Sequence, residues 1–139
     1  MPGSYLIDVP HRLVFSRGWG ILTDDDVVSH ARTLREDSRF DPGFRQIFDF
    51  RDLTEIHLTV AGIHGTAQLN PFHRDSRRAF VVPSEVAYGL ARMFEGFTGS
   101  DPEQFRVFRS IEPALEWVGL DASTPWPADE PNAVFGAAR

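Results

Sequence analysis

One stretch of the chain carries polar residues at the spacing of neighbours on one side of a helix. Tyr88, Arg92 and Glu95 lie at positions i, i+4 and i+7, and Glu85 joins that side one turn earlier. A guanidinium can hold a carboxylate or a phosphate through its planar fork of donors, so Tyr88 and Arg92 could form the polar wall of a ligand pocket. The alternative is an ordinary helix flank, in which Arg92 pairs with Glu95 for roughly 0.2–0.5 kcal/mol.

A second group of charged residues follows a short apolar run at 46–50. Asp49, Arg51 and Asp52 are placed at the carboxyl end of this run, where ligands bind in open α/β sheets. Paired carboxylates can carry out acid–base chemistry, but the local sequence supplies neither a nucleophile nor an orienting histidine. Carboxylates in loops more often cap and pair, so we predict that the protein is not an enzyme, and acid–base catalysis by Asp49 or Asp52 remains the alternative.

The sequence gives little support for a metal or a cofactor. His57 and His64 are two helical turns apart, rather than the i, i+4 pair that chelates a metal on one helix. The consecutive acidic residues 24–26 would point in different directions on a helix. The chain has no cysteine, which excludes disulfides and thiolate sites. We expect no metal and no cofactor, and the basic loop 73–78, which includes His73, could contact an anion or be solvated.

Length and charge limit the classes of function. The chain has 139 residues and a formal net charge of −6, which suits one domain and argues against a nucleic-acid-binding surface. No apolar run approaches the ~20 residues of a membrane span. Asp8 interrupts the position where a signal peptide would be apolar. We therefore expect a cytoplasmic protein that binds no nucleic acid and does not span a membrane.

Strands and helices are predicted to alternate. Apolar runs indicate five strands, at 5–8, 13–19, 46–50, 79–82 and 105–109. Capping residues and 3.6-residue periodicity indicate helices after Thr23, Thr59, Ser84 and Ser110. Asp26 completes a capping box with the first of these caps.

The buried faces of two helices can be predicted from their periodicity. Val27, Ala31 and Leu34 form the inner stripe of the first helix. The inner stripe of the third helix is predicted to be Val86, Leu90, Met93 and Phe97.

The element order β-β-α-β-α-β-α-β-α predicts an α/β fold. It corresponds to a five-stranded, mixed but mostly parallel sheet with about four helices, in a single domain at 1–119. Residues 120–139 are rich in proline and small residues, and we expect a flexible tail. Trp126 or Phe135 could pin this tail to the domain or to a partner.

This order of elements over residues 4–118 resembles the STAS family, the anti-sigma-factor-antagonist fold. Residues 46–50 match the family's strand with an apolar-Asp-apolar step, and 57–60 stand where the family has Asp-Ser-Ser-Gly. Thr59 matches the phosphorylatable hydroxyl by position and type, although the acidic residue, the first serine and the glycine are replaced. Residues 79–94 are similar to a divergent bacterial branch that also has fold similarity to CRAL-TRIO lipid carriers.

The resemblance implies a non-catalytic protein-interaction or regulatory module with a degenerate phospho-switch. A protein partner would bind the loop and helix around Thr59. The alternative is a small-molecule or lipid-binding domain, in which an aromatic pocket with Tyr88 and Arg92 takes a small apolar or anionic ligand. An exposed apolar patch would indicate a homodimer. The candidate binding residues are Asp49, Asp52, Thr59, Tyr88 and Arg92.

Overall fold

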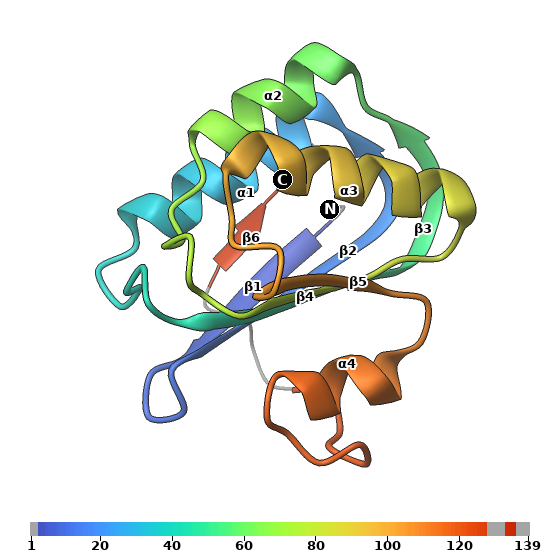
Figure 1. The fold of residues 1–139 in the computed structure, drawn as a ribbon. Coiled ribbons are helices and arrows are strands. Elements are labelled where there is room, and N and C mark those ends of the chain that lie inside the picture. Colours follow the sequence, from blue (N-terminus) through green and yellow to red (C-terminus); the bar gives the residue numbers. More distant parts are fainter. Residues whose placement is uncertain (1–2, 128–132, 136–139) are drawn as a thin grey trace.

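A mixed sheet forms the centre of the molecule (Figure 1). The computed structural model describes residues 3–127 and 133–135, and within them the strand order is β5-β4-β3-β2-β1-β6. β2, β3, β4 and β5 run parallel to one another, and β1 is antiparallel to both β2 and β6. The strands are β1 (Gly3–Asp8), β2 (Leu13–Thr23), β3 (Arg45–His57), β4 (Arg78–Val81), β5 (Phe105–Phe108) and β6 (Ala133–Phe135).

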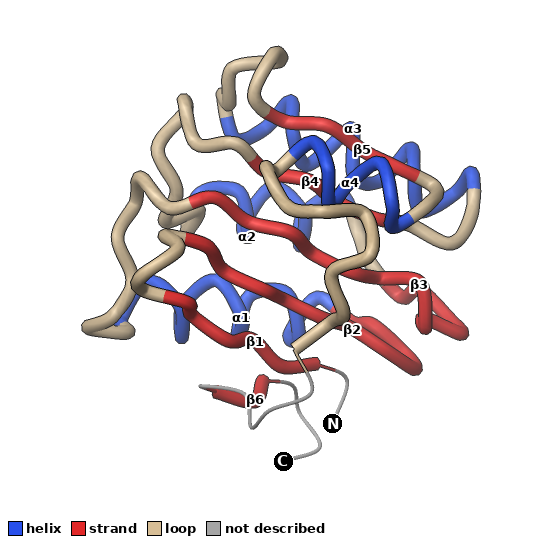
Figure 2. Tube along the Cα trace, turned by 90° about the horizontal axis from the view of Figure 1, so that it is seen from below, coloured by secondary structure: helices blue, strands red, loops and turns tan. Residues whose placement is uncertain are grey.

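Helices cover both faces of this sheet unequally. Three helices lie on one face and the short fourth helix lies on the other, as Figure 1 shows from the side and Figure 2 from below. The helices are α1 (Asp24–Glu36), α2 (Val60–Gln68), α3 (Glu85–Thr98) and α4 (Ile111–Trp117). The predicted α/β class, the mostly parallel sheet and the four helices are confirmed. No helix within the described ranges combines the length and apolar character needed to cross a bilayer.

Local capping explains where most helices begin. Thr23 and Asp26 form the predicted capping box of α1, and the Ser84 hydroxyl accepts the amide of Ala87 in α3. α3 ends at Gly99, whose φ of 69° is left-handed and favours glycine. Ser110 occupies the N-cap position of α4, but its side chain makes no capping bond, so that detail of the prediction is wrong.

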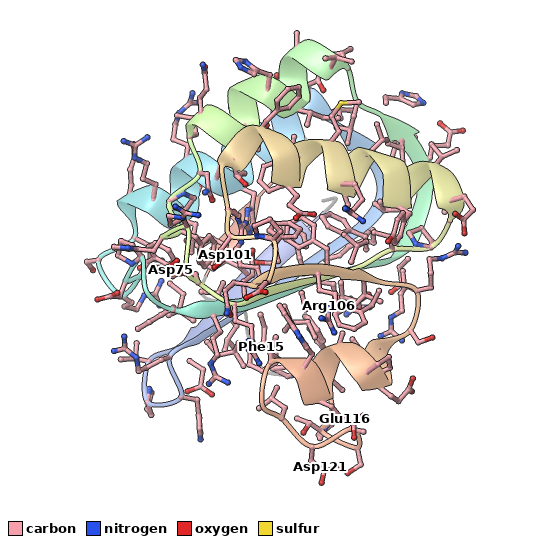
Figure 3. All side chains as sticks on the ribbon, viewed as in Figure 1. Phe15, Asp75, Asp101, Arg106, Glu116 and Asp121 are labelled. Atoms are coloured by element: carbon pink, nitrogen blue, oxygen red, sulfur yellow. The ribbon has the colours of Figure 1, made fainter. Side chains whose placement is uncertain are left out.

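Alternation along the strands gives the sheet two distinct cores. The row Val14, Gln46 and Arg78 faces α1 to α3, because these residues are direct cross-strand partners and share one side. Their neighbours along the strands, such as Ile47 and Ala79, face α4. Figure 3 labels Phe15 and Arg106, whose side chains lie on the α4 side.

Two parts of the fold differ from the sequence prediction. β3 continues to His57 instead of ending at residue 50, because the second half of β2 pairs with it after a bulge. The predicted stripe on α3 is wrong at its ends, since Val86 is 69% exposed and Phe97 is 42% exposed. The helix instead buries Ala87 and Ala91, whose small side chains leave space above the sheet.

The chain after α4 returns to the sheet. Trp126 packs edge-on against Phe15, with the ring centroids 5.4 Å apart. β6 adds a sixth strand beyond the five predicted, with the backbone of Phe135 paired with Gly3 (Figure 2). The sheet therefore extends beyond the predicted domain boundary at residue 119. The flexibility expected of the tail stays a prediction, and residues 128–132 and 136–139 lie outside the described part of the chain.

Candidate ligand-binding site

A cavity of about 90 Å³ lies between the sheet and the three helices on its larger face. β2, β3 and β4 form its floor, and α1, α2 and α3 form its walls and roof. Phe48, Phe50 and Phe80 supply aromatic surface from the strands, and Ala87 and Ala91 leave room below α3. Most of the remaining lining is aliphatic, so the cavity favours an apolar occupant.

One side of this cavity is polar, and Arg78 is at its centre. Arg78 begins β4 and is only 3% exposed. Its Nε and Nη2 donate to Oε1 of Gln46 at 3.0 and 2.9 Å, and its Nη1 donates to Oδ1 of Asn70 at 3.0 Å. Gln46 is also its cross-strand partner in β3, so the sheet itself fixes the orientation of the guanidinium.

The polar contacts continue from Gln46 to helix α1. Gln46 Nε2 donates to Ser16 Oγ at 3.0 Å, and Ser16 Oγ lies 2.9 Å from His30 Nε2. Burial, and then the charge of Arg78, lower the pKa of His30 to about 3. The imidazole is therefore neutral at pH 7, and it can accept the hydroxyl proton of Ser16 at Nε2. The network locks Gln46 and, through it, Arg78.

Aromatic rings lie close to the charge of Arg78. Its guanidinium carbon lies 4.2 Å from the ring centroid of Phe72 and 5.4 Å from that of Phe80. No acidic side chain of the described residues forms an ion pair with it. Burial lowers the pKa of Arg78 to about 9, so the group is still charged at pH 7. Cation–π contacts offset part of the cost of this buried charge.

The predicted pocket wall on α3 is an exposed helix flank. Arg92 Nη1 donates to the Tyr88 hydroxyl at 3.4 Å, and Arg92 Nε lies 3.0 Å from a Glu95 carboxylate oxygen. Glu85 does not join them and pairs with Arg109 instead. Neither Tyr88 nor Arg92 lines this cavity, and a ligand-binding role for these two residues stays a prediction. The helix places them on the flank of α3, while its alanines face inward.

The two aspartates at the end of the predicted strand have separate arginine partners. Asp49 is buried, and its Oδ1 and Oδ2 accept from Nε and Nη2 of Arg51 at 2.9 and 2.8 Å. Asp52 is exposed and lies 2.9 Å from Nη2 of Arg17. Alternation along β3 places Asp49 on the α4 side of the sheet, away from the cavity. The two aspartates therefore have different ion-pair partners, although the charge of Asp52 also acts on Arg51 and helps to raise its pKa. A binding role for Asp49 and Asp52 stays a prediction.

Thr59 caps α2 and is held by an aspartate from α1. Its hydroxyl donates to Oδ2 of Asp24 at 2.6 Å, and its amide donates to Oδ1 at 2.9 Å. The same hydroxyl accepts the amide of Gly62 at 3.0 Å. A Cβ at Gly62 would overlap the Asp24 carboxylate, so a larger residue there would have to displace that side chain from Thr59. A carboxylate thus occupies the positive end of α2.

The three histidines in the middle of the chain have separate contacts. His57 lies 3.0 Å from Glu55, the His64 ring packs edge-on against Phe97, and the His73 amide donates to the carbonyl of Pro42. The described residues contain no group of three side chains suited to hold a metal ion.

The sequence prediction missed Arg78 and Gln46 as site residues. Arg78 was assigned to a basic loop, although it is two residues before Phe80 and shares its side of the strand. Gln46 precedes Phe48 in the same way. Side chains two residues apart in a strand share one face of the sheet. This period could have shown that Gln46 and Arg78 lie on the same face as Phe48 and Phe80.

Comparison with known proteins supports the fold alone. No family model matches the chain, and no curated protein matches it. One solved structure is similar, that of an uncharacterized protein of the DUF3478 family with a SpoIIAA-like fold from Shewanella loihica. The TM-score is 0.51 at 19% identity, over 76% of this chain and 83% of the other. The fold is thus SpoIIAA-like, that is STAS-like, as the sequence resemblance predicted. The similarity to CRAL-TRIO carriers stays a prediction.

Proposed function

We propose that this protein is a non-catalytic binding module of STAS-like fold whose internal cavity takes a small apolar ligand. The observation that carries the proposal is the aromatic and aliphatic cavity below α3, with a fixed polar group on one side. This combination of an apolar lining and a few oriented polar groups is typical of ligand sites. The cytoplasmic location expected from the sequence is part of the same proposal.

The volume of the cavity limits the size of the ligand. At about 90 Å³ the cavity is smaller than the roughly 150 Å³ cavity known to take up benzene in another protein. A short chain is therefore the expected size for the cavity as it stands, and a single ring requires the cavity to widen. Leu53, Ile56 and Leu90 line the cavity and are only partly buried, so small shifts of these side chains can widen it.

Native mass spectrometry of freshly purified protein tests this proposal. We expect an additional small mass on the folded protein that disappears on denaturation. Ala91→Leu fills the cavity and should remove this mass, whereas Gly89→Ala, on the exposed side of the same helix, should retain it. A bare chain mass, together with xenon that leaves the NMR signals of Ala87 and Ala91 unchanged, would contradict the proposal.

A protein-interaction role, which was the first hypothesis from the sequence, is the second candidate. One observation favours it, since Val60 follows Thr59 at the start of α2 and is 59% exposed. A photo-crosslinker at the neighbouring Ala61 should capture one protein that a crosslinker at the exposed Glu112 of α4 does not capture. Val60→Asp should abolish that crosslink. Identical captures at the two positions would contradict a docking site on α2.

A further inference from the structure

The lining of the cavity carries a positive charge, and no acidic residue among those described lines it. Arg78 is the only Arg, Lys, Asp or Glu among the described residues that line the cavity. His30, the other titratable lining residue, is neutral at pH 7 for the reasons given above. A charge taken out of water in this way is stabilised best by an opposite charge, and the described residues do not supply one. An occupant with one negative charge would neutralise it.

The hydrogen bonds of Arg78 to Gln46 and Asn70 leave two of its N–H donors available for such an occupant. A guanidinium has five N–H donors, and Gln46 and Asn70 accept three of them. One N–H remains on Nη1 and one on Nη2. These two nitrogens share a carbon, so when Asn70 accepts the Nη1 hydrogen on the Cδ side, the other Nη1 hydrogen and the remaining Nη2 hydrogen lie side by side and match the two oxygens of a carboxylate. Because Gln46 and Asn70 already hold the side chain, binding would require little reordering.

The surroundings favour a carboxylate over a phosphate. A carboxylate has one negative charge and balances a single guanidinium, whereas a phosphate dianion would leave an unbalanced charge in an apolar cavity. A carboxylic acid can also have an apolar body that matches the alanine and phenylalanine lining. The small volume adds a second limit, because it admits a short chain beyond the carboxylate, and a ring only where the partly buried lining side chains shift.

We propose that the cavity binds a small apolar carboxylic acid as its carboxylate, whose two oxygens accept from Nη1 and Nη2 of Arg78. The apolar body of the ligand lies against Ala87, Ala91 and the phenylalanines of β3 and β4. This inference rests on the proposed function and specifies the chemical class of ligand for the same cavity.

Matched pairs of ligands test the inference. We would titrate benzoate, butanoate and hexanoate, each beside its primary amide, which has nearly the same shape and no charge. The wild-type protein should bind at least one carboxylate about tenfold or more tightly than its amide. Arg78→Met should bring this ratio close to one while amide binding persists. Arg77→Met removes an equal charge from an exposed neighbour stacked on Trp117, and it should leave the ratio unchanged.

The outcomes separate this inference from the proposed function. Equal binding of carboxylate and amide by the wild-type protein would overturn the carboxylate inference and leave an apolar site. A preference that survives in Arg78→Met would overturn the role of Arg78. Failure of every pair to bind would overturn both proposals. If Arg78→Met does not fold, the Nε–H NMR signal of Arg78 decides, because it should shift with benzoate and not with benzamide, and an equal response would contradict the inference.

Discussion

The guanidinium of Arg78 contacts the side-chain oxygen of Gln46 through two nitrogens at once, Nε at 3.0 Å and Nη2 at 2.9 Å. The two residues face each other across β4 and β3, so the sheet register brings them together. Gln46 is neutral, and the contact therefore orients the charge of Arg78 without neutralising it. The cavity therefore contains a positive charge that is held in place but not neutralised, and the proposed carboxylate ligand depends on this charge.

A substitution at Gln46 can supply the missing negative charge. Gln46→Glu places a carboxylate where the amide oxygen now accepts from Arg78, so the protein would neutralise its own cation. We expect calorimetry to show benzoate binding weakened at least tenfold and benzamide binding little changed. Gln104→Glu, which changes the partner of the exposed Arg77, is the matched control and should leave both affinities unchanged. Unchanged benzoate binding in Gln46→Glu would contradict the charge argument.

The stability of the protein should fall as the pH drops below the ordinary pKa of histidine. The folded protein holds the pKa of His30 at about 3, whereas an unfolded histidine titrates near 6.5. Between these values the unfolded state binds one more proton, so the free energy of unfolding decreases as the pH falls, by about 1.4 kcal/mol per unit. Urea denaturation should therefore show a loss of roughly 2 kcal/mol between pH 7 and pH 5.

Substitution separates this effect from the titration of other groups. His30→Gln removes the titrating ring, and its stability should vary much less between pH 7 and pH 5. His73→Gln changes an exposed histidine and should retain the wild-type slope. Equal slopes in wild type and His30→Gln would show that His30 is not the group responsible.

Two glycines of α2 should respond differently to alanine. Gly62→Ala would push the Asp24 carboxylate away from Thr59, whereas a Cβ at Gly65 meets no atom within 4 Å. Gly65→Ala should raise the free energy of unfolding by up to ~1 kcal/mol through helix propensity. Gly62→Ala should be about 1–2 kcal/mol less stable than Gly65→Ala because it loses exposed hydrogen bonds.

A double-mutant cycle with Asp24→Ala identifies the cause of this difference. Without the aspartate there is no carboxylate to displace, and the gap between the two alanine variants should close. A gap that persists in the Asp24→Ala background would mean that Gly62 is required for another reason.

Thr59 should not be a phosphate acceptor in this protein. Its hydroxyl lies 2.6 Å from an oxygen of Asp24, and a phosphate there would place about two negative charges against that carboxylate. After incubation with cell extract and ATP, mass spectrometry should find Thr59 unmodified. A synthetic phosphopeptide added to the digest establishes that the modified form would be detected. Stoichiometric phosphate on Thr59 would contradict this expectation and restore the switch.

The sequence predicted the fold better than the site. Capping residues such as Thr23 and Ser84 act locally, and the structure confirms both helix starts. The predicted buried side of α3 began at Val86, one residue before Ala87, which the structure buries. Both residues fit an apolar period, and only the tertiary packing selects between them. The site depends on contacts between strands 32 residues apart, Gln46 and Arg78, which no local pattern contains.

A crystal structure of the protein grown with sodium benzoate tests the central claim most directly. We predict a bound molecule inside the cavity, with its carboxylate within hydrogen-bonding distance of Nη1 and Nη2 of Arg78 and its ring beside Ala91. A cavity that contains only water, or a benzoate found solely on the protein surface, would contradict the claim that this cavity is a ligand site.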